Sequence, residues 1–257
     1  MIKNEINFEA LLDLVKSLNF EVQKIQKKPF KVNLKEDSSP ITEADNYVNE
    51  KLNDFVKTTS YKNIISEENK SIPFEGRRTW DYYWVIDPID GTKEFVKGGD
   101  DFTINIALCY LNRPIFGLVS VPIKNDIYYA FKKNGAFKNN EKIQTDDNKE
   151  FLKIAVSKSH LNESTQNYVN QLKRKEKVKL IGIGSSLKIC YLADLKANIY
   201  PRFGPTMEWD TCAADIILEE AGGKILSTNN ELLSYNKENL LNPNFIAYAK
   251  GYLSYKL

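Results

Sequence analysis

The chain has 257 residues, 42% of them hydrophobic and 12% aromatic, which is enough to bury a substantial core and argues against a disordered chain. Its 36 Lys and Arg residues nearly balance its 34 Asp and Glu residues. The resulting formal charge of +2 excludes the whole-molecule field that a nucleic-acid polymer or an anionic membrane would need, so any anion binding must be local.

Two amphipathic helices are expected near the N-terminus. In the first, apolar residues recur at three- and four-residue steps over 11–25, and the pattern ends before Pro29. In the second, the apolar residues of 44–55 share one face, and Thr42 is the expected N-cap. The polar stretch 35–39 between them is expected to form a loop.

The middle of the chain is rich in β-forming residues. The runs are separated by Pro, Gly and Asn, and they predict an antiparallel, meander-like sheet. They cover residues 82–86, 102–110, 115–121 and 127–131.

From about residue 151, strands and helices are expected to alternate. Strands are predicted at 154–156, 178–183 and 198–200. A polar helical stretch follows the first strand, and further helices are predicted at 187–195 and from about 209 to 221, where Gly222 and Gly223 end the pattern. The whole pattern predicts an α/β fold, with an α+β N-terminal half (residues 1–150), an α/β C-terminal half (residues 151–257) and a junction at 146–150.

The three cysteines suit a reducing compartment. Cys109, Cys190 and Cys212 form no CxxC pair, and any disulfide scheme would leave one unpaired, so we interpret them as small buried apolar residues. The first 20 residues are interrupted by charges and contain neither an export signal nor a membrane-spanning stretch. We expect a soluble, cytoplasmic protein, and the sequence leaves open a homodimer and a peripheral position at the inner face of a membrane.

Two aspartates end the apolar strand of residues 82–86. Pro88 and Gly91 force the chain to turn there, so Asp87, Asp90 and a backbone carbonyl are crowded into one turn. Such like charges are costly to place together unless a cation lies between them, which favours half of a metal site. A surface turn with two solvated aspartates is the alternative, and this segment alone leaves both open.

Other acidic segments have ordinary structural explanations when each is taken singly. Glu67 and Glu68 end another apolar strand. Asp210 opens a helix, where an aspartate is ordinarily a cap. Asp45 completes a Thr-x-x-acid capping box with Thr42.

Taken together, these segments resemble the inositol-monophosphatase-like family of metal-dependent, lithium-sensitive phosphatases. The motifs that carry the resemblance are, in chain order, Ser39 to Asp45, Ser66 to Glu68, Asp87 to Thr92 and Glu208 to Asp215. They extend over most of the chain, and their joint occurrence is highly specific. The resemblance implies a layered αβαβα sandwich of the sugar-phosphatase type, with the site between the two halves.

The resemblance also implies a metal site. Glu67, Asp87 and the carbonyl of Ile89 match the family's ligands for one Mg²⁺, and Asp87, Asp90 and Asp210 match those for a second, within a site for two or three ions. An all-oxygen set of this kind suits Mg²⁺ or Mn²⁺ rather than zinc, which prefers His or Cys.

Direct attack of water on the phosphate is the chemistry that the resemblance implies. Asp45 matches the base partner and Thr92 the hydroxyl relay for this water, and we count Glu67 with them as catalytic. The N–H groups of Gly91 and Thr92, with Lys93, are expected to contact phosphate oxygens.

The substrate is indicated by the residues around these motifs. Asp-Gly-Thr is followed by Lys93, Glu94 and Phe95, where inositol phosphatases commonly continue with Thr-Asn, and Ser66 stands where they usually place Gly. Both features look like the 3′(2′),5′-bisphosphate nucleotidase branch, which implies hydrolysis of adenosine 3′,5′-bisphosphate to AMP and phosphate and a role in sulfur assimilation. An inositol monophosphatase or another small sugar phosphatase of the same fold is the alternative.

A second phosphate needs its own cationic pocket. Ser185, Lys188 and Arg202 lie in segments that resemble those binding the 5′-phosphate and the nucleoside in that branch, with Asp210 beside them, although exposed basic side chains would give the same sequence. His160, the single histidine, would ordinarily be a surface or hydrogen-bonded residue, and the resemblance implies that it contacts the substrate. The expected partner is therefore a small bisphosphorylated nucleotide, and no nucleic-acid polymer.

Overall fold

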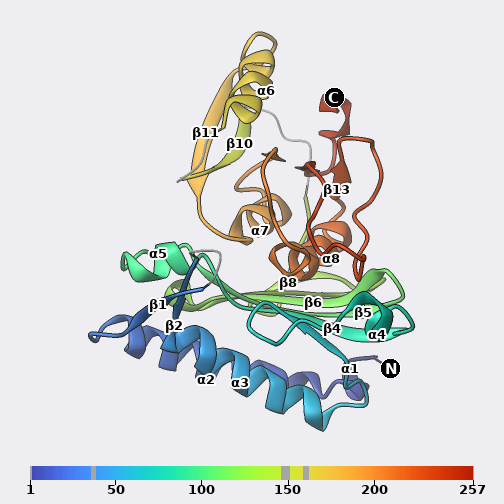
Figure 1. Cartoon of the computed structure of the whole chain (residues 1–257). Coiled ribbons are helices and arrows are strands. Elements are labelled where there is room, and N and C mark those ends of the chain that lie inside the picture. The colour runs from blue at the N-terminus through green and yellow to red at the C-terminus, as the bar shows by residue number, and fades with distance from the viewer. Residues whose placement is uncertain (1, 36–38, 146–150, 159–161, 257) are drawn as a thin grey trace.

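The structure is a computed structural model that describes residues 2–35, 39–145, 151–158 and 162–256. Its helices and sheets are stacked in layers (Figure 1). The expected junction at 146–150 and His160 lie outside the described residues, and the division of the chain at residue 150 stays a prediction. No helix within the described ranges combines the length and the apolar character needed to cross a membrane.

The first layer is a pair of helices that covers one face of a seven-stranded sheet (Figure 1). These are α2 (Phe8–Gln26), preceded by the short α1 (Ile2–Glu5), and α3 (Glu43–Thr58). The hairpin of β1 (Val32–Leu34) and β2 (Pro40–Thr42) connects them. Both long helices agree with the sequence prediction, and Thr42 is the N-cap of α3.

The seven-stranded sheet has the order β3-β4-β5-β6-β7-β8-β9. Its strands are β3 (Ile64–Ser66), β4 (Tyr82–Asp90), β5 (Thr103–Tyr110), β6 (Arg113–Val121), β7 (Asp126–Phe131), β8 (Gly135–Lys138) and β9 (Glu141–Ile143). The meander prediction holds from β4 onward, but β3 pairs with β4 in parallel. Short helical elements lie between strands: α4 (Phe74–Arg77), α5 (Thr92–Val96) and η1 (Pro122–Lys124).

Both faces of this sheet are buried, which explains its near-continuous apolar sequence. Along β5, Ile104, Ile106 and Leu108 face the core formed with α2 and α3, while Ala107 and Cys109 face the core on the opposite side. That second face packs against α7 (Leu187–Ala193) and α8 (Cys212–Glu220).

The five-stranded sheet lies beyond α7 and α8 and has the order β11-β10-β12-β14-β13. Its strands are β10 (Leu152–Ser157), β11 (Val178–Ile183), β12 (Ile199–Arg202), β13 (Lys224–Ser227) and β14 (Phe245–Tyr248). Strand β10 is parallel to β11 and β12, whereas β14 is antiparallel to β12 and β13. The remaining helical elements are α6 (Glu163–Lys173), which packs on this sheet, η2 (Glu208–Asp210) and η3 (Leu253–Tyr255). The layered αβαβα arrangement is therefore confirmed.

Two helix predictions in this part need correction. The helix expected at 187–195 ends at Ala193. The helix expected from 209 to 221 is a 3₁₀ turn, Glu208–Asp210, followed by α8. The carboxylate of Asp210 accepts a hydrogen bond from the Met207 backbone N–H at 3.0 Å, which closes the turn before the α-helix begins.

A close approach joins the two central layers. A Cβ atom at Gly117 of β6 would lie 2.3 Å from the backbone oxygen of Ala213 and 2.5 Å from Ile216 Cγ2, both on α8. The absence of a side chain at this position therefore lets α8, and the Asp210 turn before it, lie directly on the seven-stranded sheet.

Candidate active site

A bulge in β4 brings two carboxylates to the same side of the sheet. Asp87 pairs with Asn105 and Asp90 with Thr103, so three residues of β4 advance while β5 advances by two. Side chains alternate along a regular strand, and one extra residue returns Asp90 to the side that Asp87 occupies. Gly91 then turns the chain with a φ of +93°, and α5 begins at Thr92.

Glu67 reaches the same place from the neighbouring strand. Because β3 is parallel to β4, with Ser66 opposite Ile86, Glu67 leaves the sheet beside Asp87, and its N–H donates to the Ile86 carbonyl at 3.2 Å. Asp210 arrives from the turn before α8.

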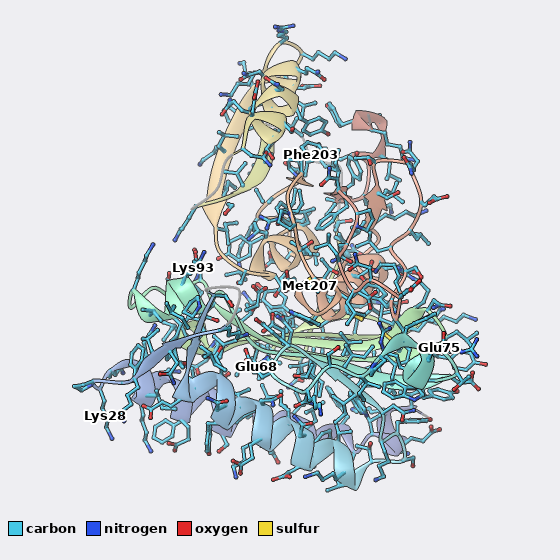
Figure 2. The ribbon with its side chains drawn as sticks, in the orientation of Figure 1. Lys28, Glu68, Glu75, Lys93, Phe203 and Met207 are labelled. Carbon is cyan, nitrogen blue, oxygen red and sulfur yellow. The ribbon has the colours of Figure 1, made fainter. Side chains whose placement is uncertain are left out.

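These residues line one cavity of about 710 Å³ between the end of β4 and the turn before α8. Its lining includes every predicted metal ligand and the three residues expected to contact the scissile phosphate: Glu67, Asp87, Ile89, Asp90, Asp210, Gly91, Thr92 and Lys93. Two of the lining residues come from different layers of the molecule (Figure 2). Lys93 is on α5, beside the seven-stranded sheet, and Met207 is in the C-terminal part of the chain.

The carboxylates carry more negative charge than the protein compensates. Burial, and then the charges of Glu67, Asp90 and Asp210, raise the pKa of Asp87 well above its ordinary value. Burial also raises the pKa of Asp210, with Asp90 as the next cause. The pKa of Asp90 rises to about 6 through burial, although the charge of Lys188 opposes the shift. Among the described residues, no donor reaches the buried Asp87 Oδ1.

These features fit a divalent cation with oxygen ligands. Four carboxylates and the Ile89 carbonyl line the cavity, and an unsatisfied buried carboxylate oxygen is costly without a cation. Within the described part of the chain, no three Asp, Glu, His or Cys side chains lie close enough together to hold a metal ion without some movement. Because like charges repel, cation binding would draw these carboxylates together.

Asp45 makes the contacts of a helix cap and also a contact with Thr92. Its Oδ2 accepts hydrogen bonds from the Thr42 N–H at 2.8 Å and the Thr42 hydroxyl at 2.5 Å, which completes the capping box of α3. Its Oδ1 accepts from the Thr92 hydroxyl at 3.2 Å. Thr92 Oγ1 also lies 3.0 Å from the Ile89 carbonyl. The capping contacts therefore hold Asp45 behind Thr92, and burial raises the pKa of Asp45.

A second pocket of about 150 Å³, called the cationic pocket here after its Lys93, Lys188 and Arg202, adjoins the first and shares the acidic residues Asp90, Glu94 and Asp210 with it. Ser185, Lys188 and Arg202 line it, as the resemblance implies. The alternative of an exposed lysine is wrong for Lys188, which is 5% exposed and whose pKa is lowered by burial to about 8. Arg202 ends β12 and donates to the Pro205 carbonyl at 2.7 Å, and its buried Nε has no hydrogen-bond partner among the described residues.

The sequence analysis missed Lys35, which it assigned to a loop. Lys35 Nζ lies 2.7 Å from Glu67 and 2.5 Å from Glu68, so a built-in ammonium group partly compensates the acidic cavity. The sequence signal that could have indicated this contact is weak, because a lysine in a polar loop is ordinarily solvated.

Comparisons with known proteins identify the family of this chain. The model of the inositol monophosphatase family matches residues 6–254. This chain belongs to that family.

Relatives within the family are similar over nearly their whole length. The chain is 38% identical over 224 residues to the 3′(2′),5′-bisphosphate nucleotidase CysQ of Escherichia coli K12, covering 85% of this chain and 89% of that one. It is 35% identical over 250 residues to the CysQ of Buchnera aphidicola, with 94% and 93% covered. Among solved structures, CysQ from Bacteroides thetaiotaomicron aligns with a TM-score of 0.87 and 37% identity over 97% of this chain and 99% of that one. An inositol monophosphatase of Thermotoga maritima, 23% identical, aligns with a TM-score of 0.77 over 94% and 91% and shares the fold.

Proposed function

We propose that this protein is a Mg²⁺-dependent 3′(2′),5′-bisphosphate nucleotidase that hydrolyses adenosine 3′,5′-bisphosphate to AMP and phosphate. The observation that carries the proposal is the contact between two unlike pockets: an acidic cavity suited to cations and a scissile phosphate, and a cationic pocket suited to a second phosphate. The relatives named CysQ support the same activity.

The acidic cavity would hold the metal ions. Glu67, Asp87, the Ile89 carbonyl, Asp90 and Asp210 are the proposed ligands of two or three Mg²⁺ ions. Bound Mg²⁺ supplies Lewis-acid chemistry, which neutralises charge on the phosphoryl oxygens and on the leaving group.

Thr92 and Asp45 are proposed to handle the attacking water. The Thr92 hydroxyl can accept a hydrogen bond from the water while it donates to Asp45 Oδ1, so the contact orients the nucleophile and gives its proton a destination. Gly91, Thr92 and Lys93, which line the cavity, are proposed to contact the scissile phosphate.

The cationic pocket selects the substrate. Lys188 and Arg202 are proposed to hold the 5′-phosphate, with Ser185 beside them. A buried cation left without its anion is costly, so a substrate that lacks this phosphate binds less well. Inositol 1-phosphate has one phosphate and would leave these residues without a phosphate partner.

A phosphate-release panel tests the proposal. With Mg²⁺, kcat/KM for adenosine 3′,5′-bisphosphate should exceed that for inositol 1-phosphate, and a chelator should abolish both. Inhibition by Li⁺ is expected from the family resemblance. Equal or better turnover of inositol 1-phosphate would assign the chain to the alternative activity.

The proposal includes a cytoplasmic location. Its support is the set of three free, buried cysteines, which is typical of a reducing compartment. The homodimer stays a prediction, and size-exclusion chromatography with light scattering tests it. Contact between His160 and the substrate also stays a prediction.

A further inference from the structure

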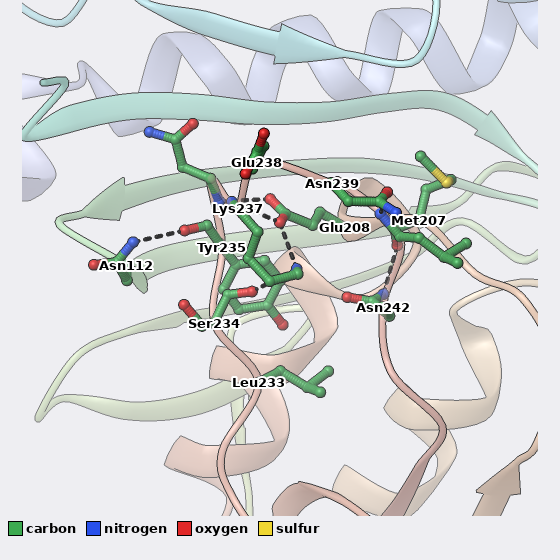
Figure 3. A network of polar contacts seen from close by, with 12 residues as sticks. Asn112, Met207, Glu208, Leu233, Ser234, Tyr235, Lys237, Glu238, Asn239 and Asn242 are labelled. Carbon is green, nitrogen blue, oxygen red and sulfur yellow. Dashed lines mark hydrogen bonds and ion pairs between the residues drawn. The ribbon is translucent and has the colours of Figure 1, made fainter. Parts of the chain in front are cut away.

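The segment 234–242, between β13 and β14, lies against the turn that carries Asp210 (Figure 3). Glu208 of this turn has 0% of its surface exposed. Its carboxylate accepts hydrogen bonds from the backbone N–H of Asn236 at 2.6 Å and of Lys237 at 3.0 Å, and it forms an ion pair with Lys237 Nζ at 2.5 Å. Burying a carboxylate is costly unless such partners satisfy it, so Glu208 and the segment hold each other in place.

Further contacts fix both ends of the same turn. The Glu208 N–H donates to the Leu240 carbonyl at 2.9 Å. Asn242 Nδ2 donates to the Met207 carbonyl at 2.7 Å and to Thr211 Oγ1 at 3.1 Å. Asp210 lies between these anchored residues, so its backbone has little freedom to move.

The segment is also attached to the layer that carries the other metal ligands. Arg77, which is 3% exposed, donates to Asn236 Oδ1 at 2.6 Å and to the Glu238 carbonyl at 2.9 Å. Asn236 Nδ2 donates back to the Arg77 carbonyl at 2.8 Å. Asn112, between β5 and β6, exchanges hydrogen bonds with the backbone of Tyr235 at 2.9 and 3.1 Å. The segment therefore connects the Asp210 turn to elements of the seven-stranded sheet.

We infer that Glu208, through its contacts with segment 234–242, is a positioning residue that keeps Asp210 in the cavity with Asp87 and Asp90, against the repulsion between these carboxylates, so that the three can bind a cation. This inference rests on the metal site proposed above. Like charges push Asp210 away from Asp90, and a turn anchored at Glu208 resists that repulsion. Glu208 itself touches neither metal nor substrate in this role.

Mg²⁺ binding, measured by calorimetry without substrate, tests the inference. Glu208→Gln and Lys237→Met should each weaken Mg²⁺ binding by about 10–100-fold, the usual effect of removing a partner that orients a metal ligand. The double variant should lose no more than Glu208→Gln alone, because both changes break one contact. Turnover should return to the wild-type value at saturating Mg²⁺.

Asp194→Asn is the matched control. Asp194 is also a buried carboxylate, with ion pairs to Lys196 at 2.8 Å and Lys138 at 3.7 Å, at the far end of α7. This variant should lower the melting temperature and leave Mg²⁺ affinity unchanged. If Glu208→Gln does not fold, Lys237→Met still decides the question, since Lys237 is partly exposed.

Three results would each decide against a part of the scheme. Wild-type Mg²⁺ affinity in both Glu208→Gln and Lys237→Met would overturn the positioning role and leave the metal site standing. An equal loss of affinity in Asp194→Asn would attribute the effect to general destabilisation and also overturn it. No Mg²⁺ binding by the wild-type chain would reject the metal site itself.

Discussion

Substitution of Lys188 should have opposite effects on substrate binding and on the stability of the fold. Its pKa is lowered by burial from 10.5 to about 8, a shift that corresponds to roughly 3 kcal/mol of destabilisation when the lysine is charged in the folded protein. The unfolded chain binds the proton more tightly, so this cost is fully present below pH 8 and disappears as the pH rises towards 10.5. Lys188→Met should therefore raise the melting temperature at pH 7, and the gain should shrink above pH 8.

The same variant should lose activity only where a second phosphate is present. A hydrogen bond between charged groups contributes about 1.5–3 kcal/mol, which corresponds to a loss of roughly 10–150-fold in kcat/KM for adenosine 3′,5′-bisphosphate. Adenosine 3′-monophosphate lacks the 5′-phosphate, and its kcat/KM should not change. Lys179→Met, at an exposed position on β11, is the control for loss of one positive charge.

The refuting result is a parallel loss. If Lys188→Met reduces kcat/KM equally for both substrates and also lowers the melting temperature, Lys188 supports the fold and the reasoning about the second pocket fails. An unchanged kcat/KM for both substrates would equally exclude contact with the 5′-phosphate.

Three more predictions follow from the site and its surroundings. Asp90→Asn should abolish Mg²⁺-dependent turnover while the circular dichroism spectrum stays native, and near-normal turnover would contradict the metal assignment. Thr92→Ala should lower kcat by about 10²–10⁴-fold with little change in KM, because it removes the contact with Asp45, whereas Thr92→Ser should retain most activity; a large fall in Thr92→Ser would instead indicate a packing role. Cys109 Sγ and Cys212 Sγ lie 3.3 Å apart, all three cysteines are buried, and burial raises the pKa of the Cys212 thiol. A thiol reagent should therefore label none of the three cysteines in the native protein and all three after unfolding. Rapid labelling of the native protein would refute their burial.

The sequence predicts which residues form this site, but it does not predict how the fold brings them together. Asp87 and Asp90 can be placed in one turn from Pro88 and Gly91, but the bulge that turns both to one side depends on pairing with β5. Glu67 can be placed at a strand end, yet its position beside Asp87 depends on the parallel pairing of β3 and β4, which no local pattern encodes.

Lys188 and Glu208 show why other features of the site could not be predicted from the sequence. A lysine near a helix start is ordinarily solvated, but Lys188 is 5% exposed because its ammonium group lies 5.3 Å from the ring centre of Tyr200 on β12 and 3.4 Å from the Ile183 carbonyl. Glu208 belongs to a recognised motif, but its ion pair with Lys237 lies on a segment without regular secondary structure. Asp45 is the opposite case, since the capping box and the contact with Thr92 use different oxygens of one carboxylate, and the capping and the proposed catalytic role are compatible.

Gly117 lies away from the proposed metal ligands, but we expect its substitution to be as harmful as the substitution of one of those ligands. A methyl group there would overlap the backbone of Ala213, and the least costly relief is a lift of α8 away from the sheet. The first residues to shift would be those at the start of that helix and in the turn before it, which includes Asp210. Substitutions at the contact between α8 and the seven-stranded sheet should therefore reduce activity even though they lie far from the bound phosphate.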